Sequence, residues 1–373
     1  MLLFDSFSEF CLIFAKGKFV MRELIMEQRV IISKHLKIEL ATAISECEHD
    51  KIFVLVDETT KEKCWPVISD FFSLKKAQVI TIGATDTHKD LETIAHVWKS
   101  MGEGGGSRHS LLINLGGGMV TDLGGFAAST FKRGVNFINI PTTLLAMVDA
   151  SVGGKTGINF NGLKNEIGVF NDSKFVILDT EFLKTLDQPN IISGYAEMLK
   201  HGLISNEKMW AELVDYDLQD PDLKKLQRMV ADSVAVKEKV VTEDPLEKGI
   251  RKALNYGHTF GHAFESWSLK RKPILHGYAV GFGMIPELYL SVTKTGFPSD
   301  KMRQTVNFIR ENYGTLDITC DDYDELIELM HHDKKNQDGI INFTLLGGIG
   351  DIRINQTATV EEIKEALDFF REG

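Results

Sequence analysis

Short apolar runs alternate with helical periodicity over the first half of the chain, and this alternation restricts the fold more than any other feature. The runs at 51–57, 77–83 and 110–118 are continuously apolar, as expected of strands buried on both faces. Helical patterns, KEKCWPVISDFF and ETIAHVWKSM, follow the first two runs, and FINIP and KFVILD (174–179) complete the series. Strands that alternate with helices form a parallel sheet covered on both faces, so the sequence predicts a Rossmann-like, doubly wound α/β domain.

The pattern changes after about Pro189. Long helical stretches and then short strand-like pieces follow at 193–205, 221–243, 252–268, 341–346 and 351–354. We therefore expect an α/β domain over 28–188 and a mainly α-helical domain over 189–373, with the functional site in the cleft between them. A chain of 373 residues is long enough for each domain to bury its own core.

Residues 1–27 precede this pattern and fit neither domain. Their apolar piece, FCLIFA, is too short for a membrane anchor, and Asp5 and Glu9 are atypical of the start of a signal peptide. We interpret the segment as an extension from an upstream start codon, with Met21 or Met26 as the other possible starts. A poor signal peptide is the alternative.

Charge and cysteine content exclude several classes of protein. The formal net charge of -11 argues against broad binding of nucleic acid or anionic membranes. No apolar run reaches the length of a membrane span. The cysteines, Cys11, Cys47, Cys64 and Cys320, are too widely spaced for a disulfide framework or a cysteine zinc site. A cytoplasmic protein with a small-molecule ligand fits these features.

A glycine-rich segment, LGGGMVTDLGGF (115–126), follows a predicted strand and opens a predicted helix. Glycine lets the backbone approach a pyrophosphate, and the N–H groups of a helix N-terminus bind its negative charge. The spacing is not G-x-G-x-x-G, so a tight strand–helix turn is an equal alternative. Asp57, just past a strand end, is a candidate partner for a ribose hydroxyl, and the alternative is an ordinary cap.

The segment 141–168 carries an unusual set of polar residues. Apart from the helical LLAMVDA, we expect it to be mostly loop. With Arg133 just upstream, its chemically interesting side chains are Asp149, Lys155, Lys164 and Asn165. Lysines on a glycine-rich loop can supply charge to a phosphate or a carboxylate. Solvated lysines on a surface loop are the alternative.

Two histidines, His258 and His262, lie four residues apart in LNYGHTFGHAFE, within the helix predicted for 252–268. Residues at this spacing share a helix face, so the two imidazoles could chelate one metal. A pair of this kind on an apolar helix is more often structural.

Two other segments strengthen the metal interpretation. SGYAEMLKHG, with Ser193 as the expected N-cap, places Glu197 and Lys200 on one helix face, and ILHGYAVG presents His276 beside a glycine. A carboxylate and two imidazoles from separate segments leave an open coordination position, which is the arrangement of catalytic zinc.

The segments GGGMVTDLGGF, PTTLLAMVDASVGGKTGIN, KNEIG, YAEMLKHG, GIRKALNYGHTFGHAFE and LHGYAVG occur in this order. Together they resemble the 3-dehydroquinate synthase family over roughly residues 50–350. The wider kin of that family are the sugar-phosphate cyclases and the iron-containing and glycerol dehydrogenases. The resemblance implies that Glu197, His258 and His276 bind one divalent ion, zinc or cobalt, while His262 faces the substrate.

The resemblance also implies two larger sets of contacts. The NAD contacts would be Asp57, Asp86, Lys89, Gly116, Gly117, Gly118, Met119, Val120, Thr121, Asp122, Thr142, Thr143, Lys155, Lys164, Phe182, Leu183, Lys184 and Thr185. The substrate and catalytic contacts would be Arg133, Asp149, Lys155, Lys164, Asn165, Lys200, Lys237, Arg251, Asn255, His262 and either Lys334 or Lys335. Asp86 and Tyr278 depart from the usual family pattern, which weakens the match locally.

The family converts 3-deoxy-D-arabino-heptulosonate 7-phosphate to 3-dehydroquinate and phosphate in the shikimate pathway, and its members imply a homodimer here. The reaction combines transient oxidation by NAD, elimination of phosphate, reduction and an intramolecular aldol closure. Two other functions stay open. A cyclase of the 2-deoxy-scyllo-inosose synthase type acts on a substrate without a carboxylate and should alter the group of Lys237, Arg251 and Asn255, which is intact here. A metal-dependent polyol dehydrogenase would not need Lys155, Lys164, Lys237 and Arg251 together.

Overall fold

A computed structural model describes residues 28–332 and 340–372. The proposed extension at 1–27 and the lysine pair Lys334–Lys335 lie outside these residues. The first part of the described chain forms a six-stranded sheet in the order β1-β8-β5-β4-β2-β3, with every pair parallel. Its strands are β1 (Arg29–Ile32), β2 (Ile52–Asp57), β3 (Gln78–Ile82), β4 (Leu111–Gly116), β5 (Asn136–Pro141) and β8 (Phe175–Leu178).

Helices cover both faces of the sheet, which explains the continuously apolar strands. Phe53 and Leu55 of β2 belong to the core beneath α5 and α6, whereas Val54 and Val56 belong to the core on the opposite face. The helices of this part are α2 (Leu36–Glu46), α3 (Glu58–Lys63), α4 (Trp65–Ile68), α5 (Leu91–Glu103) and α6 (Gly118–Thr130). The predicted doubly wound α/β architecture is therefore confirmed.

The segment expected to be mostly loop is largely an antiparallel hairpin, so that prediction was wrong. Strands β6 (Lys155–Phe160) and β7 (Leu163–Phe170) are joined by Asn161 and Gly162. Both joining residues have positive φ, +50° and +78°, as a two-residue hairpin turn requires. The Asn161–Gly162 pair is a local signal for such a hairpin, but the prediction of a loop did not take it into account. Before it, the helical LLAMVDA contributes a π-helical turn, η4 (Ala146–Ala150).

Helices dominate the second part of the chain, as expected. They are α7 (Gln188–Ser205), α8 (Glu207–Val214), α9 (Leu223–Glu243), α10 (His258–Leu269), α11 (His276–Leu290), α12 (Ser299–Tyr313), α13 (Tyr323–His331) and α14 (Val360–Glu372). The predicted strand-like pieces form a separate hairpin, β9 (Asn342–Gly348) and β10 (Asp351–Thr357). None of the helices in the described ranges is long and apolar enough to cross a membrane.

Two helix boundaries differ from the prediction. Helix α7 begins before Ser193 and is capped by Asp187, whose carboxylate accepts from the backbone N–H of Asn190, so Ser193 lies inside the helix. Pro189 falls in the first turn, where the absence of its N–H costs no helical hydrogen bond. The helix expected over 252–268 is interrupted at Gly257, which has a φ of +79°. A short 3-10 helix, η6 (Ile250–Asn255), precedes the break, and α10 follows it.

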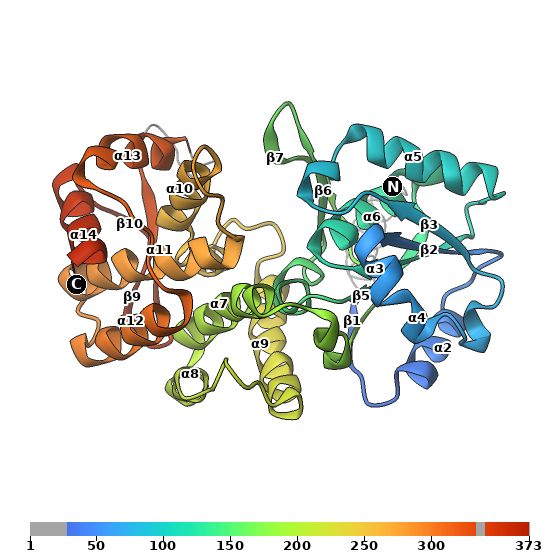
Figure 1. Cartoon of the computed structure of the whole chain (residues 1–373), viewed down its shortest axis with the longest axis horizontal. Coiled ribbons are helices and arrows are strands. Elements are labelled where there is room, and N and C mark those ends of the chain that lie inside the picture. Colours follow the sequence, from blue (N-terminus) through green and yellow to red (C-terminus); the bar gives the residue numbers. More distant parts are fainter. Residues whose placement is uncertain (1–27, 333–339, 373) are drawn as a thin grey trace, which may run out of the picture.

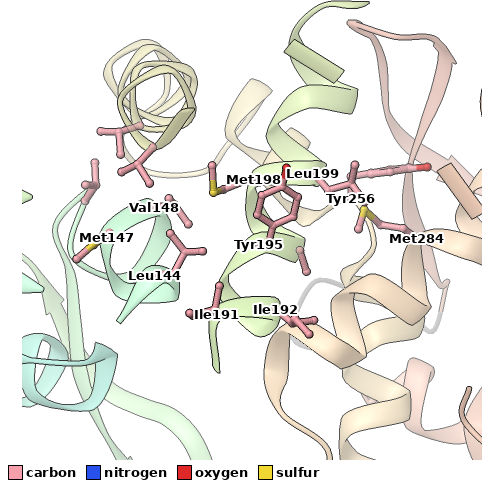
Figure 2. Packing of buried hydrophobic residues seen from close by; sticks show 14 of the residues in the cluster. Leu144, Met147, Val148, Ile191, Ile192, Tyr195, Met198, Leu199, Tyr256 and Met284 are labelled. Atoms are coloured by element: carbon pink, nitrogen blue, oxygen red, sulfur yellow. The ribbon is translucent and has the colours of Figure 1, made fainter. Parts of the chain in front are cut away.

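Helix α7 runs between the sheet-containing part and helices α10 to α14 (Figure 1). On one side its Ile191 lies towards Leu144, and on the other Leu199 lies towards Tyr256 (Figure 2). One continuous apolar cluster therefore extends from a face of the sheet through α7 into the helical part. This shared core fixes the position of α7 relative to both parts.

Candidate active site

Three side chains from three helices converge as a metal-binding group. Glu197 lies in α7, and His258 and His276 are the first residues of α10 and α11. One potential ligand atom from each lies within 4.8 Å of the others. The Oε1 atom of Glu197 is 3.4 Å from Nε2 of His258 and 3.7 Å from Nε2 of His276. The break at Gly257 lets α10 begin with His258 facing this group.

The buried charge of Glu197 suits a cation. Its side chain is 0% exposed, Lys200 pairs with its Oε2, and its Oε1 faces the two imidazoles. Burial alone would raise the pKa of this carboxyl, but Lys200 and His258 hold the pKa well below its usual range. Burial would lower the pKa of His276, yet hydrogen bonds to Glu197 and Glu265 raise it to about 10. The donor atoms of one carboxylate and two imidazoles converge here, so the residues present fit a divalent ion.

Lysines and an arginine surround this group. Lys200, one turn after Glu197, pairs with it and is 1% exposed. Lys237 of α9 donates to Oδ1 of Asp149 at 2.5 Å, and burial lowers the pKa of its ammonium group despite that carboxylate. Arg251 is 2% exposed and donates through Nη2 to the backbone oxygen of Gly153 at 3.0 Å. These contacts join the helical part to the segment before β6.

The hairpin β6–β7 makes further contacts across the two parts. Lys155 pairs with Glu247, whose other oxygen accepts from Nδ2 of Asn255 at 2.9 Å. Lys164 pairs with Glu265 of α10 at 2.7 Å. The side chains of Lys155 and Lys164 are 53% and 52% exposed, so both ammonium groups remain accessible to a ligand.

The glycine segment lies where the strand order changes direction. Strand β2 has β3 on one side and β4 on the other, and ligands of doubly wound sheets bind at such a point, outside the carboxyl ends of the strands. Asp57 ends β2, and Gly116 ends β4. None of the described side chains caps the N-terminus of α6, which follows Gly117, so its first N–H groups can bind an anion. This arrangement fits a dinucleotide.

Polar contacts connect this edge of the sheet to the hairpin. Lys89 donates to Asp122 of α6 and to Asn165 of β7, each at 2.5 Å. Asn159 of β6 donates to a carboxylate oxygen of Asp86 at 3.1 Å. The sheet edge and the hairpin are thereby bridged through residues expected to contact NAD.

Both parts of the chain are similar to proteins of one known family. The family models described as "3-dehydroquinate synthase N-terminal" and "3-dehydroquinate synthase C-terminal" match residues 79–193 and 194–336. A 3-dehydroquinate synthase of Parabacteroides distasonis is 56% identical, covering 93% of this chain and 99% of that protein. One from Pyrococcus furiosus is 38% identical, covering 88% and 93%. The chain belongs to the 3-dehydroquinate synthase family.

Solved structures with the same fold extend beyond that family. A 2-epi-5-epi-valiolone synthase from Streptomyces hygroscopicus, solved with NAD+ and Zn2+ bound, has a TM-score of 0.80 and 26% identity, covering 93% of this chain and 97% of that one. An iron-containing alcohol dehydrogenase from Thermotoga maritima has a TM-score of 0.64 and 12% identity, covering 92% and 97%. The two-part architecture is thus shared with sugar-phosphate cyclases and iron-type dehydrogenases.

Most of the residues that the family resemblance singled out lie close to one another. Asp57, Gly116–Gly118 and Thr142 share one edge of the sheet, and Met119–Thr121 form the first turn of α6. His262 lies beside the metal-binding group, with ring centroids 5.3 Å from His258 and 6.1 Å from His276. In η5 (Thr180–Thr185), the hydroxyl oxygen of Thr185 lies 3.6 Å from the sulfur of Cys64.

Two of the predicted residues do not join the rest, and a third is outside the described part of the chain. Arg133 lies beyond the far end of α6 and lines a hollow with Arg108, Ser129 and Lys174, away from the metal-binding group. Lys184 of η5 is 60% exposed and pairs with Glu181. Lys334 lies outside the described residues.

Two acidic residues of the site were missed in the sequence. Glu247 holds Lys155 and Asn255, and its φ of +58° is unusual for a residue other than glycine. Its surroundings, DPLEKG, look like an ordinary exposed turn. Glu265 holds Lys164 and contacts His276. Its spacing of seven residues from His258 was the available signal, since both then lie on one helix face.

Proposed function

We propose that this chain is a 3-dehydroquinate synthase that converts 3-deoxy-D-arabino-heptulosonate 7-phosphate to 3-dehydroquinate and phosphate, with NAD and one divalent ion. The observation that carries the proposal is the assembly of Glu197, His258 and His276 beside buried Lys200 and Lys237, in a chain of this family. A doubly anionic substrate needs such a concentration of positive charge in a protein that is acidic overall.

Glu197, His258 and His276 would hold the ion, and the strand ends near Asp57 with the first turn of α6 would hold the dinucleotide. When bound, the ion supplies Lewis acidity to a substrate hydroxyl, and NAD supplies a reversible hydride acceptor.

The chain's own residues bind and orient the substrate. Lys155 and Lys164, both partly exposed, can neutralise its phosphate. Arg251 can bind its carboxylate, since Nε has no acceptor in the described chain while Nη1 and Nη2 donate to backbone oxygens. His262, beside the ligands but outside the ligand set, is placed to exchange a proton with the substrate.

The substrate assay separates this function from its relatives. The protein should release phosphate and form dehydroquinate from the heptulosonate phosphate, and it should leave glucose 6-phosphate unchanged. Turnover of glucose 6-phosphate would instead indicate a cyclase for sugars without a carboxylate. Net reduction of NAD by a polyol would indicate a dehydrogenase.

We also propose that the protein is a cytoplasmic homodimer. Every residue of β7 is exposed, including the large apolar side chains of Leu163, Ile167 and Phe170, so a second copy could cover this strand. The free thiols of Cys47, Cys64 and Cys320 suit a reducing compartment. Light scattering should give twice the chain mass of 41.8 kDa, and a mass equal to that of one chain would contradict the dimer.

A further inference from the structure

Glu265 uses its two carboxylate oxygens for two different parts of the molecule. Oε2 lies 3.1 Å from Nδ1 of His276, and Oε1 lies 2.7 Å from Nζ of Lys164. Its side chain is only 12% exposed, and it follows His258 and His262 along one face of α10. Burial and these two contacts, with His276 and with Lys164, fix the position of the Glu265 carboxylate.

The contact with His276 determines which ring nitrogen is available to an ion. Nδ1 faces Glu265, so Nε2 faces Glu197 at 3.7 Å from Oε1. A histidine that donates its Nδ1 proton to a carboxylate is fixed in tautomer and ring orientation, and its other nitrogen becomes the better metal ligand.

The contact with Lys164 fixes the tip of the hairpin. Lys164 is the second residue after the Asn161–Gly162 turn, and Asn165 follows it. Within one chain, strand β7 is exposed along its whole length, so packing inside the chain contributes little to the position of this strand. The ion pair with Glu265 therefore ties the tip to the helix that carries His258.

We propose that Glu265 is a positioning residue that orients His276 for the divalent ion and anchors the tip of the β6–β7 hairpin beside it. This inference rests on the proposed function insofar as the ion belongs to the Glu197–His258–His276 site. The Glu265 carboxylate thus orients a metal ligand and also positions Lys164 and the neighbouring Asn165.

Metal affinity tests the first half. Co(II) affinity would be measured by competition with a chromophoric chelator for Glu265→Gln, Glu265→Asp and Lys164→Met, together with the visible Co(II) spectrum. Glu265→Gln should bind about 10- to 100-fold more weakly and change the spectrum, because His276 loses its charged partner. Glu265→Asp should recover part of the affinity, and Lys164→Met, which leaves His276 untouched, should stay near the wild-type value. Wild-type affinity in both Glu265 variants would overturn the assignment.

Hydrogen exchange of the backbone amides at 163–170 tests the second half. Glu265→Gln and Lys164→Met should each speed exchange there. The double variant should exchange no faster than either single variant, since both remove one ion pair. Unchanged exchange in Glu265→Gln would overturn the anchoring role. Neither readout involves turnover, so a chain that formed no dehydroquinate would refute the proposed function and leave these results standing.

Discussion

Buried charges in the site are neutralised in pairs. Glu197 lies against Lys200, and Asp149 lies against Lys237. An isolated charge as deeply buried as that of Glu197 or Lys200 would cost several kcal/mol, so each of these two residues requires the other. Substituting one member therefore changes the charge of the whole site as well as a single contact.

The metal ligands can be distinguished from their neighbour by substitution. His258→Ala should lose bound zinc or cobalt because one of three ligands is removed. His262→Ala should retain the ion, since His262 is outside the ligand set, and should lose turnover by about 100- to 10,000-fold if it transfers a proton. Metal content of the dialysed proteins and their kcat values check both outcomes. Full metal content in His258→Ala would contradict the ligand assignment.

Arg251 should contribute strongly to substrate binding. In Arg251→Ala an anionic substrate group would be left without its partner in a desolvated site, at a cost of about 2–5 kcal/mol. That free energy corresponds to a loss in kcat/KM of about thirty-fold to several thousand-fold. Arg251→Lys should recover only part, because lysine lacks the planar fork. Metal content serves as the control and should not change; an unaltered kcat/KM would rule out the carboxylate role.

At the scale of elements, the site depends on how closely helices approach. A Cβ at Gly277, the second residue of α11, would lie 1.7 Å from the backbone oxygen of Ser193 in α7. Only glycine permits this approach, which brings His276 beside Glu197. The short distance between two metal ligands is thus a consequence of helix packing.

Gly277→Ala should therefore separate α7 from α11. We expect a loss of about 1–3 kcal/mol in unfolding free energy, together with weaker metal binding, because Ser193 and its helix must shift. Gly102→Ala is the matched control, since a Cβ there meets nothing within 4 Å in the last turn of α5 and should stabilise by about 0.5–1 kcal/mol. Denaturant unfolding and metal titration check both; equal stability of Gly277→Ala and wild type would contradict the packing argument.

The sequence predicted elements where the signal was local and continuous. The strands of the sheet were predictable because residues such as Phe53 and Val54 are apolar towards both faces. The hairpin was missed because β7 has no buried face and therefore no hydrophobic alternation. Ser193 resembles a cap in the sequence, whereas the actual cap, Asp187, lies six residues earlier and two residues before Pro189.

The residues of the site were predictable where each of them belongs to a family motif. Family motifs singled out Glu197, His258 and His276, which the fold brings within reach of one ion. Glu247 and Glu265 were not found because their partners, Lys155 and Lys164, lie 92 and 101 residues away in the chain. Such pairs depend on tertiary structure, and the spacing of Glu265 from His258 indicates a shared helix face without indicating the contact with Lys164.

At the scale of the whole molecule, the two parts meet through polar contacts around one site. Lys237 with Asp149, Arg251 with Gly153, and Lys164 with Glu265 each connect the helical part to the segment 149–164. The apolar core that includes residues of α7 also joins the two parts (Figure 2). The sheet edge expected to hold NAD and the helices expected to hold the ion are thereby kept facing one substrate.

The central proposal is that one site oxidises its substrate, eliminates phosphate from it and then reduces it again, so that NAD is regenerated in every turnover. The most direct measurement is to supply the metal-loaded protein with the heptulosonate phosphate and about one hundredth as much NAD. Phosphate and dehydroquinate should then form in equal amounts until the substrate is consumed, with no accumulation of NADH. Product limited to the amount of NAD added, or NADH formed in step with product, would contradict the claim.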